Sequence, residues 1–233
     1  MKKVGFVVLT ILFSVLQNVS AQDCSKSFYA LKEGTKMTMT SFNDKGKITS
    51  TSESFIKSVK ADGANYDATV ESTTKNDKGK VLFEGKTFNV KCENGTIKMD
   101  ISSLMMADFA QQIKDMEISI SGNGMEIPPV LTEGMALSDG TTEMKMGSKG
   151  MTFMNMKFDV KNRKVEKKES ITTAAGTFDC YKITYDMDMK VMFKRAVSVK
   201  QWFAEGVGLV KSESYNKKGE LEGSTELTKF EKP

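Results

Sequence analysis

Methionine is the residue type whose number and spacing in this chain most clearly suggest chemistry. The sequence has 17 methionines, and eight of them form Met-x-Met pairs: Met37 with Met39, Met144 with Met146, Met154 with Met156, and Met187 with Met189. In a β-strand, residues two apart share one face and lie about 6.6 Å apart along the chain. Because thioethers are soft ligands, such a face could in principle hold Cu(I).

Two other interpretations of the pairs need no metal. Any methionine-rich strand core produces Met-x-Met by alternation alone, which is the closed-core interpretation. Unbranched thioether chains also adapt to ligands of different shape, and small antiparallel barrels often enclose cavities. Since no histidine is present to complete a metal site, we predict no metal and no cofactor.

The absence of histidine also bears on catalysis. It removes the commonest general base and the Ser/His and Cys/His nucleophile pairs. No G-x-S-x-G or supported S-x-x-K motif, and no paired-acid motif, takes its place. We therefore predict that the protein is not an enzyme.

The three cysteines lie far apart, at Cys24, Cys92 and Cys180, and form no C-x-x-C pair. In an oxidising compartment, two of them are expected to form a disulfide. Cys24 lies just after residues 1–21, which the sequence predicts to be a cleaved signal peptide, so Cys24 can reach a strand partner with little strain. We predict the pair Cys24–Cys92, with Cys24–Cys180 as the alternative.

Every odd position over 181–193 is apolar, and the even positions from 182 to 190 are polar, a pattern typical of a strand with one buried face. The apolar members of this run are Tyr181, Ile183, Tyr185, Met187, Met189, Val191 and Phe193. A second alternating run covers Met154 to Val160. From these two runs we predict the lining of an apolar ligand site: Tyr185, Met187, Met189, Phe193, Met154 and Met156.

Turn signals separate the apolar runs. The pentapeptide Asn-Asp-Lys-Gly-Lys occurs at 43–47 and again at 76–80, and a variant occurs at 216–220. Each places a glycine where a hairpin loop needs a positive φ. These signals predict about a dozen strands joined as hairpins, in an all-β antiparallel meander that forms a barrel or half-barrel.

One short helix is predicted near the middle of the chain, from Leu104 to Met116, with Ser103 as its N-cap. We expect a single β domain over residues 22–233. Similar Leu-x-Glu-Gly motifs at 31–34 and 131–134 leave open an arrangement of two related β halves, about 22–120 and 121–233.

The first 21 residues are typical of a signal peptide. Lys2 and Lys3 precede a largely apolar run, and Val19-Ser20-Ala21 forms a small-residue cleavage site. No later stretch approaches the roughly 20 apolar residues of a membrane helix. We expect an exported protein, periplasmic or secreted, with no membrane-spanning segment in the mature chain. The formal net charge is only +4, which gives no reason to expect nucleic-acid binding.

Two segments carry a family resemblance: AGTFDCYKI from Ala175 and WFAEGVGLVKSE from Trp202. They resemble signature segments of an uncharacterised exported family of Bacteroidetes-type bacteria, similar to the domain of unknown function 3108 family. The resemblance implies an antiparallel barrel-like or half-barrel domain in the cell envelope and carries over no catalytic residues. The expected function is binding of an apolar small molecule or lipid. The alternative is an envelope structural module with a closed core that binds another envelope protein.

Overall fold

The computed structural model describes residues 24–99, 117–149, 151–190 and 193–233. The predicted signal peptide and the predicted helix from Leu104 to Met116 lie outside the described residues. The described chain forms one short 3-10 helix, η1 (Cys24–Lys26), followed by β-strands. The strands are β1 (Lys36–Asn43), β2 (Ile48–Asp62), β3 (Asn65–Asn76), β4 (Val81–Glu93), β5 (Thr96–Met99), β6 (Glu117–Gly122), β7 (Glu126–Ile127), β8 (Gly140–Ser148), β9 (Met151–Thr173), β10 (Gly176–Lys190), β11 (Lys194–Ala204), β12 (Gly208–Tyr215) and β13 (Leu221–Glu231).

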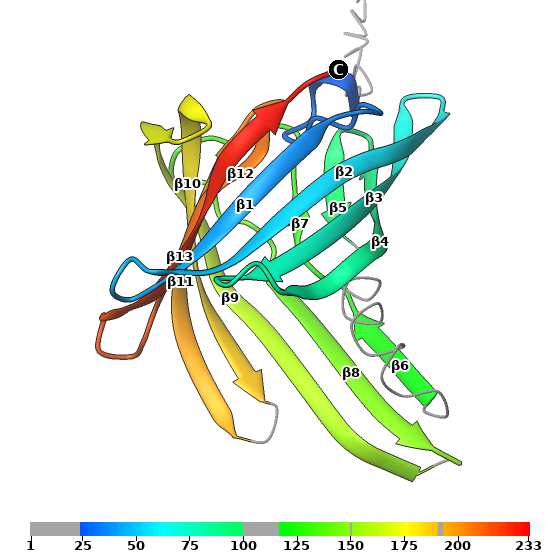
Figure 1. Ribbon diagram of the computed structural model, residues 1–233, viewed down its shortest axis with the longest axis vertical. Helices are drawn as coiled ribbons and strands as arrows, with labels where there is room; N and C mark the ends of the chain where they lie inside the picture. The colour runs from blue at the N-terminus through cyan, green and yellow to red at the C-terminus, as the bar shows by residue number, and fades with distance from the viewer. Residues whose placement is uncertain (1–23, 100–116, 150, 191–192) are drawn as a thin grey trace, which may run out of the picture.

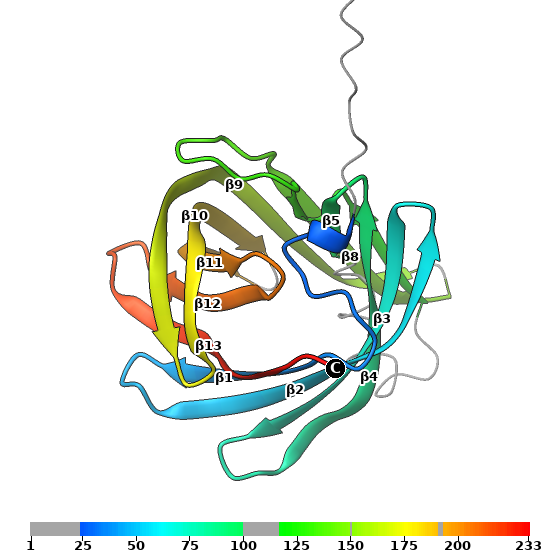
Figure 2. The ribbon, with the colours of Figure 1, turned by 90° about the horizontal axis from the view of Figure 1, so that it is seen from above.

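All the described strands belong to one 13-stranded sheet in the order β6-β8-β9-β10-β11-β12-β13-β1-β2-β3-β4-β5-β7. The pairings within it are antiparallel. The strongly curved sheet follows a ring when seen from above (Figures 1 and 2). The predicted all-β antiparallel meander with half-barrel character is confirmed. Strands from both candidate halves, about 22–120 and 121–233, contribute to this one sheet.

The sheet does not close strand to strand, but the segment after β7 connects its β7 end to β9. The backbone N–H of Gly134 donates to the carbonyl of Val165, and the N–H of Val165 donates to the carbonyl of Met135, at 2.8 and 2.9 Å. The N–H of Leu137 donates to the carbonyl of Arg163 at 2.9 Å. This segment therefore holds β7 in place beside the middle of β9.

The three predicted Asn-x-x-Gly turns form as expected. Gly46, Gly79 and Gly219 have φ values of 70°, 75° and 78°. In the first turn, the side-chain Oδ1 of Asn43 accepts hydrogen bonds from the backbone N–H groups two and four residues later, at 3.0 and 2.9 Å. The other two turns repeat this pattern. Each turn is thus stabilised by its own residues.

Both faces of the β10–β11 pair are buried where the two strands cross the middle of the sheet. Ile183 and Phe203, at odd positions, pack in the main core with side chains from β2 to β5 and from the N-terminal segment. Cys180 and Trp202, at even positions, lie on the opposite face in a second cluster with Leu227 of β13. A third cluster consists of methionines on β8 and β9.

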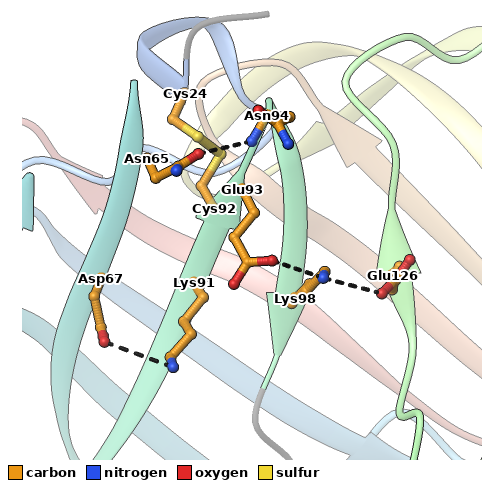
Figure 3. Close-up of polar contacts among 9 residues, drawn as sticks. All are labelled: Cys24, Asn65, Asp67, Lys91, Cys92, Glu93, Asn94, Lys98 and Glu126. Atoms are coloured by element: carbon orange, nitrogen blue, oxygen red, sulfur yellow. Dashed lines mark hydrogen bonds and ion pairs between the residues drawn. A yellow bond between two sulfur atoms is a disulfide. The ribbon is translucent and has the colours of Figure 1, made fainter. Parts of the chain in front are cut away.

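The disulfide in the structure joins Cys24 to Cys92, with a Cα–Cα distance of 5.9 Å (Figure 3). It fixes the N-terminal segment to β4, at the end of the ring where η1 lies. On the neighbouring strands, Lys98 Nζ lies 2.7 Å from Glu93 Oε2 and 3.7 Å from Glu126 Oε1, which links β4, β5 and β7. Cys180 is a buried free thiol, and burial raises its pKa to about 12.

Candidate apolar binding site

The methionine-rich runs of the sequence lie side by side on β8, β9 and β10. Register places Met144 opposite Met156 and Met146 opposite Met154. On the other side of β9, Met187 lies opposite Val160 and Met189 opposite Phe158. Because alternate residues of a strand share a face, these rows form one continuous apolar surface across three strands.

The β8–β9 part of this surface is a compact methionine cluster. Met144, Met146 and Met156 are buried, and Met154 and Phe158 pack against them. Such side chains carry no polar group to orient a substrate. They form an adaptable wall, because unbranched thioether chains change rotamer at little cost.

A cavity of about 250 Å³ lies beside this cluster. Its lining residues are Gly124, Met125, Gly140, Thr141, Thr142, Phe158, Val160 and Met187. The volume is slightly below the range of about 300–1,000 Å³ common for small-molecule pockets. The lining is almost entirely apolar, so this cavity is suited to a hydrocarbon segment.

The loop that covers one side of the cavity is held by Asn123. Its Oδ1 accepts a 2.8 Å hydrogen bond from the backbone N–H of Thr141, and its Nδ2 donates to the carbonyl of Asp139 at 3.2 Å. The fit between loop and strand is close: a Cβ added at Gly140 would overlap the carbonyl oxygen of Gly124. The hydroxyl of Thr141 donates a 2.8 Å hydrogen bond to Asp159.

The six residues predicted as ligand-binding lie in different surroundings. Met187 lines the cavity. Met154 and Met156 belong to the methionine cluster, which reaches the cavity through Phe158. Tyr185 is buried in the main core, and Met189 packs at the edge of that core.

Phe193, the sixth predicted residue, is separated from the other five. Its side chain is 84% exposed. It lies after the end of β10, next to residues 191–192, which are outside the described residues. The run of apolar odd positions therefore extends to Phe193, whereas β10 ends at Lys190.

Arg163 has a structural role in this region that the sequence does not predict. It is only 5% exposed, and its guanidinium donates to the carbonyl of Ser138 at 2.8 Å and to that of Glu126 at 3.0 Å. These bonds connect β9 to both ends of the segment between β7 and β8, at Glu126 in β7 and at Ser138 just before β8. Burial lowers the pKa of Arg163, and burial raises the pKa of Tyr185, which interacts with it, to about 12.

The only sequence signal for Arg163 is its rarity. Lysine accounts for all but two of the 34 basic residues, and the other arginine is Arg195. A planar guanidinium can donate to two carbonyls at once, which a lysine ammonium does less well. Within the run Lys-Asn-Arg-Lys, however, the charge pattern is typical of a solvated surface.

A family model described as DUF3108-like matches residues 32–227. The chain belongs to the DUF3108-like family. The match extends from before β1 into β13 and so includes nearly the whole sheet of this DUF3108-like protein. The family resemblance found in the sequence is confirmed.

Two solved structures share the fold. A "putative exported protein with YmcC-like fold" from Bacteroides fragilis is 24% identical, with a TM-score of 0.71 over 89% of this chain and 100% of that chain. A "putative lipoprotein" from Parabacteroides distasonis is 23% identical, with a TM-score of 0.72 over 90% of this chain and 100% of that chain. Because both structures are less than 25% identical in sequence, their similarity supports the fold of this DUF3108-like protein and nothing about its function.

A comparison with curated proteins gives no match. Among the described residues, no helix combines the length and the hydropathy needed to cross a membrane.

Proposed function

We propose that this protein is an exported, non-catalytic binding protein that holds an apolar, lipid-like ligand in the cavity beside Met187. The observation that carries the proposal is the combination of an almost wholly apolar cavity with an adjoining methionine cluster. The cavity provides space for a hydrocarbon segment. The methionines provide a wall that can repack around ligands of different shape.

The polar groups near the cavity support a binding role over a catalytic one. The hydroxyl groups that line the cavity belong to Thr141 and Thr142, and the hydroxyl of Thr141 already donates a hydrogen bond to Asp159. Burial raises the pKa of Tyr185, which keeps this phenol protonated and unsuited to act as a base at neutral pH. Asp159 is the carboxylate in hydrogen-bonding reach of the Thr141 hydroxyl, but hydrogen bonds from Lys157 and then from Thr141 lower the pKa of Asp159, which makes it a weak general base.

Export is the second part of the proposal. The basic start, apolar run and Val19-Ser20-Ala21 site support removal of residues 1–21. The names of the two structural relatives, an exported protein and a lipoprotein, agree with an envelope location. Intact mass and N-terminal sequencing of protein from the native compartment test this part. The expected mature chain begins at Gln22, and a diacylglyceryl group on Cys24 would contradict both the cleavage site and the disulfide.

The rival function is an envelope structural module with a closed core. The two functions differ in what happens when a large side chain enters the cavity. In a ligand-binding protein, Met187→Trp fills existing space, so it abolishes ligand binding and costs little stability. In a closed core, the same change overpacks and costs about 1–3 kcal/mol.

The experiment measures saturable binding of the neutral apolar fluorophore N-phenyl-1-naphthylamine together with the melting temperature. We expect the wild type to bind the probe and Met187→Trp to lose binding while the melting temperature changes little. Met37→Trp, which alters a half-buried methionine of the second cluster, is the matched control and should keep probe binding. Absence of saturable binding by the wild type, with a melting temperature several degrees lower in Met187→Trp, would favour the closed core.

A further inference from the structure

Two hairpin ends lie at the end of the molecule opposite to η1 and the C-terminus (Figure 1). One belongs to β8 and β9, and the other to β10 and β11. Lys190, the last residue of β10, pairs with Lys157, so β9 continues six residues further to Met151. The two ends are therefore staggered along the strands by about 20 Å.

These ends are basic although the chain as a whole is almost neutral. Residues 145–157 contain three lysines and no acidic residue. Residues 189–195 contain two lysines, one arginine and no acidic residue. Three of these six basic side chains pair with neighbouring carboxylates: Lys145 with Glu143, Lys157 with Asp159, and Arg195 with Glu222. The local excess is therefore carried by the other three, which make no ion pair among the described residues: Lys149, Lys190 and Lys194.

The same ends carry the three most exposed large hydrophobic side chains of the described residues. Phe193 is 84% exposed, Met151 is 63% exposed and Phe153 is 60% exposed. Exposed apolar side chains scattered singly are ordinary. Three of them at the tips of two lysine-rich hairpins form a pattern that needs a physical explanation.

A basic groove of about 400 Å³ lies beside the β10–β11 end. Its lining residues are Lys157, Asp159, Asp188, Met189, Lys190, Lys194, Arg195, Ala196 and Lys217. Both carboxylates are already paired: Asp159 lies 3.0 Å from Lys157, and Asp188 lies 2.9 Å from Lys161. Within the described part of the chain, Lys190, Lys194 and Lys217 take part in no ion pair, so their charges remain available to an external anion.

We propose that this end of the molecule docks onto an anionic lipid bilayer. Phe193, Phe153 and Met151 enter the interface between headgroups and acyl chains, where aromatic and apolar side chains are favoured. Lys190 and Lys194 contact lipid phosphates, with Lys149 doing so at the other tip. Basic residues close to an anionic membrane surface each add to the attraction, which salt screens.

The separation of the two tips favours a bilayer over a protein partner, and their stagger means that the molecule docks tilted, so that both tips reach the interface. A protein interface buries one contiguous and complementary patch. Here the exposed apolar residues are on separate tips. A fluid bilayer can accept separate insertion points, and its headgroups supply negative charge at both. The methionine cluster lies on the same two strands as the Phe153 tip, so the docking end adjoins the apolar surface without sharing the cavity residues.

Flotation with lipid vesicles tests the proposal on the full mature protein. We expect binding to vesicles of phosphatidylcholine with added phosphatidylglycerol, weak binding to phosphatidylcholine alone, and release by salt. The double variants Phe153→Ser with Phe193→Ser, and Lys190→Gln with Lys194→Gln, should each weaken binding by about ten-fold or more.

Matched controls are available on other hairpins. Leu82→Ser removes a hydrophobic side chain that is 47% exposed, and Lys45→Gln with Lys47→Gln removes two exposed charges from the β1–β2 turn. Both should bind vesicles like the wild type. Equal binding to neutral and anionic vesicles, no binding at all, or equal losses in the control variants would overturn the proposal. The tip variants should retain binding of N-phenyl-1-naphthylamine, which separates failure of docking from failure of the cavity.

Discussion

The indole Nε1 of Trp202 donates a 2.8 Å hydrogen bond to Oε1 of Glu169, which lies two strands away in the sheet. The intervening strand contributes Lys182, whose ammonium lies 5.6 Å from the centre of the Trp202 ring. Lys211 on β12 lies 5.8 Å from the same centre. The indole therefore connects four neighbouring strands through its edge and its faces.

Acid titration should be visible in the fluorescence of Trp202, the only tryptophan of the chain. Hydrogen bonds from Lys167 and then from Trp202 lower the pKa of Glu169 below its ordinary value of 4.5. Because the pKa of Glu169 is lower in the folded state, its ionised carboxylate stabilises the fold fully at pH values above its unfolded-state pKa. This stabilisation is lost as the pH falls through its folded-state pKa. We expect emission to stay constant down to about pH 4.5 and to change below it.

The variant Glu169→Gln should remove that acid transition, because the amide does not ionise. Glu166→Gln, three residues earlier on the same strand, is the control and should keep it. The same transition in Glu169→Gln as in the wild type would assign the acid response to another group.

The Cys24–Cys92 disulfide should make a large contribution to stability. It closes a loop with a sequence separation of 68 residues, which in the chain-entropy model corresponds to about 4 kcal/mol. We expect the double variant Cys24→Ser with Cys92→Ser to lose about that much free energy of unfolding in urea titrations. Non-reducing peptide mapping should find Cys24 linked to Cys92. Three free thiols, or a link from Cys24 to Cys180, would contradict this.

Replacement of Arg163 should loosen the segment between β7 and β8. Arg163→Met removes two hydrogen bonds and leaves the carbonyls of Ser138 and Glu126 without that donor. We expect a loss of about 2–4 kcal/mol in the free energy of unfolding and faster amide hydrogen exchange at residues 134–137.

Arg195→Met is the matched control for Arg163, since these are the two arginines of the chain. Arg195 is largely exposed and pairs with Glu222 at 2.6 Å, and an exposed ion pair contributes about 0–1 kcal/mol. Equal destabilisation by the two replacements would show that burial of Arg163 has no special effect.

Gly140→Ala should disturb the wall of the cavity. The added methyl group would overlap the carbonyl oxygen of Gly124, so the loop that contains Met125 must move. We expect weaker binding of the apolar probe and a loss of about 1–3 kcal/mol. Gly46→Ala, which has open space but a positive φ of 70°, should lower stability without changing probe binding. Unchanged probe binding by Gly140→Ala would show that this loop does not shape the site.

The sequence predicts the strands and turns of this protein because their signals are local. Alternation over 181–190 identifies β10, and the glycine at position 46 marks a hairpin loop regardless of what surrounds it. The sequence also shows the Met-x-Met pairs of β8 and β9, but the register that places Met144 opposite Met156 comes from the structure. These local signals identify where strands alternate apolar and polar residues and where turns separate them.

The candidate site is less accessible from sequence because its parts come from distant segments. Gly124 and Met125 reach the cavity because β6 pairs with β8 and the loop after β6 bonds to Thr141. No periodicity in the sequence encodes this pairing of two strands that are not consecutive. Arg163 is buried by tertiary contacts, although the lysines beside it in the sequence are typical of an exposed strand face. Phe193 continues the apolar alternation of β10, but strand pairing ends before it, so the pattern predicts burial at a position that is exposed.

The pairing of β1 with β13 has a consequence for the order in which the chain can fold. Nine of the twelve neighbouring pairs in the sheet join strands that are consecutive in sequence, and self-contained turns such as 43–47 let hairpins form early. The β1–β13 ladder, in which Met37 lies opposite Phe230, is by contrast a contact between the two ends of the chain. During vectorial synthesis or export, the edge of β1 that pairs with β13 stays without its hydrogen-bonding partner until residues 221–231 have emerged. The sheet can therefore be completed only after β13 is available.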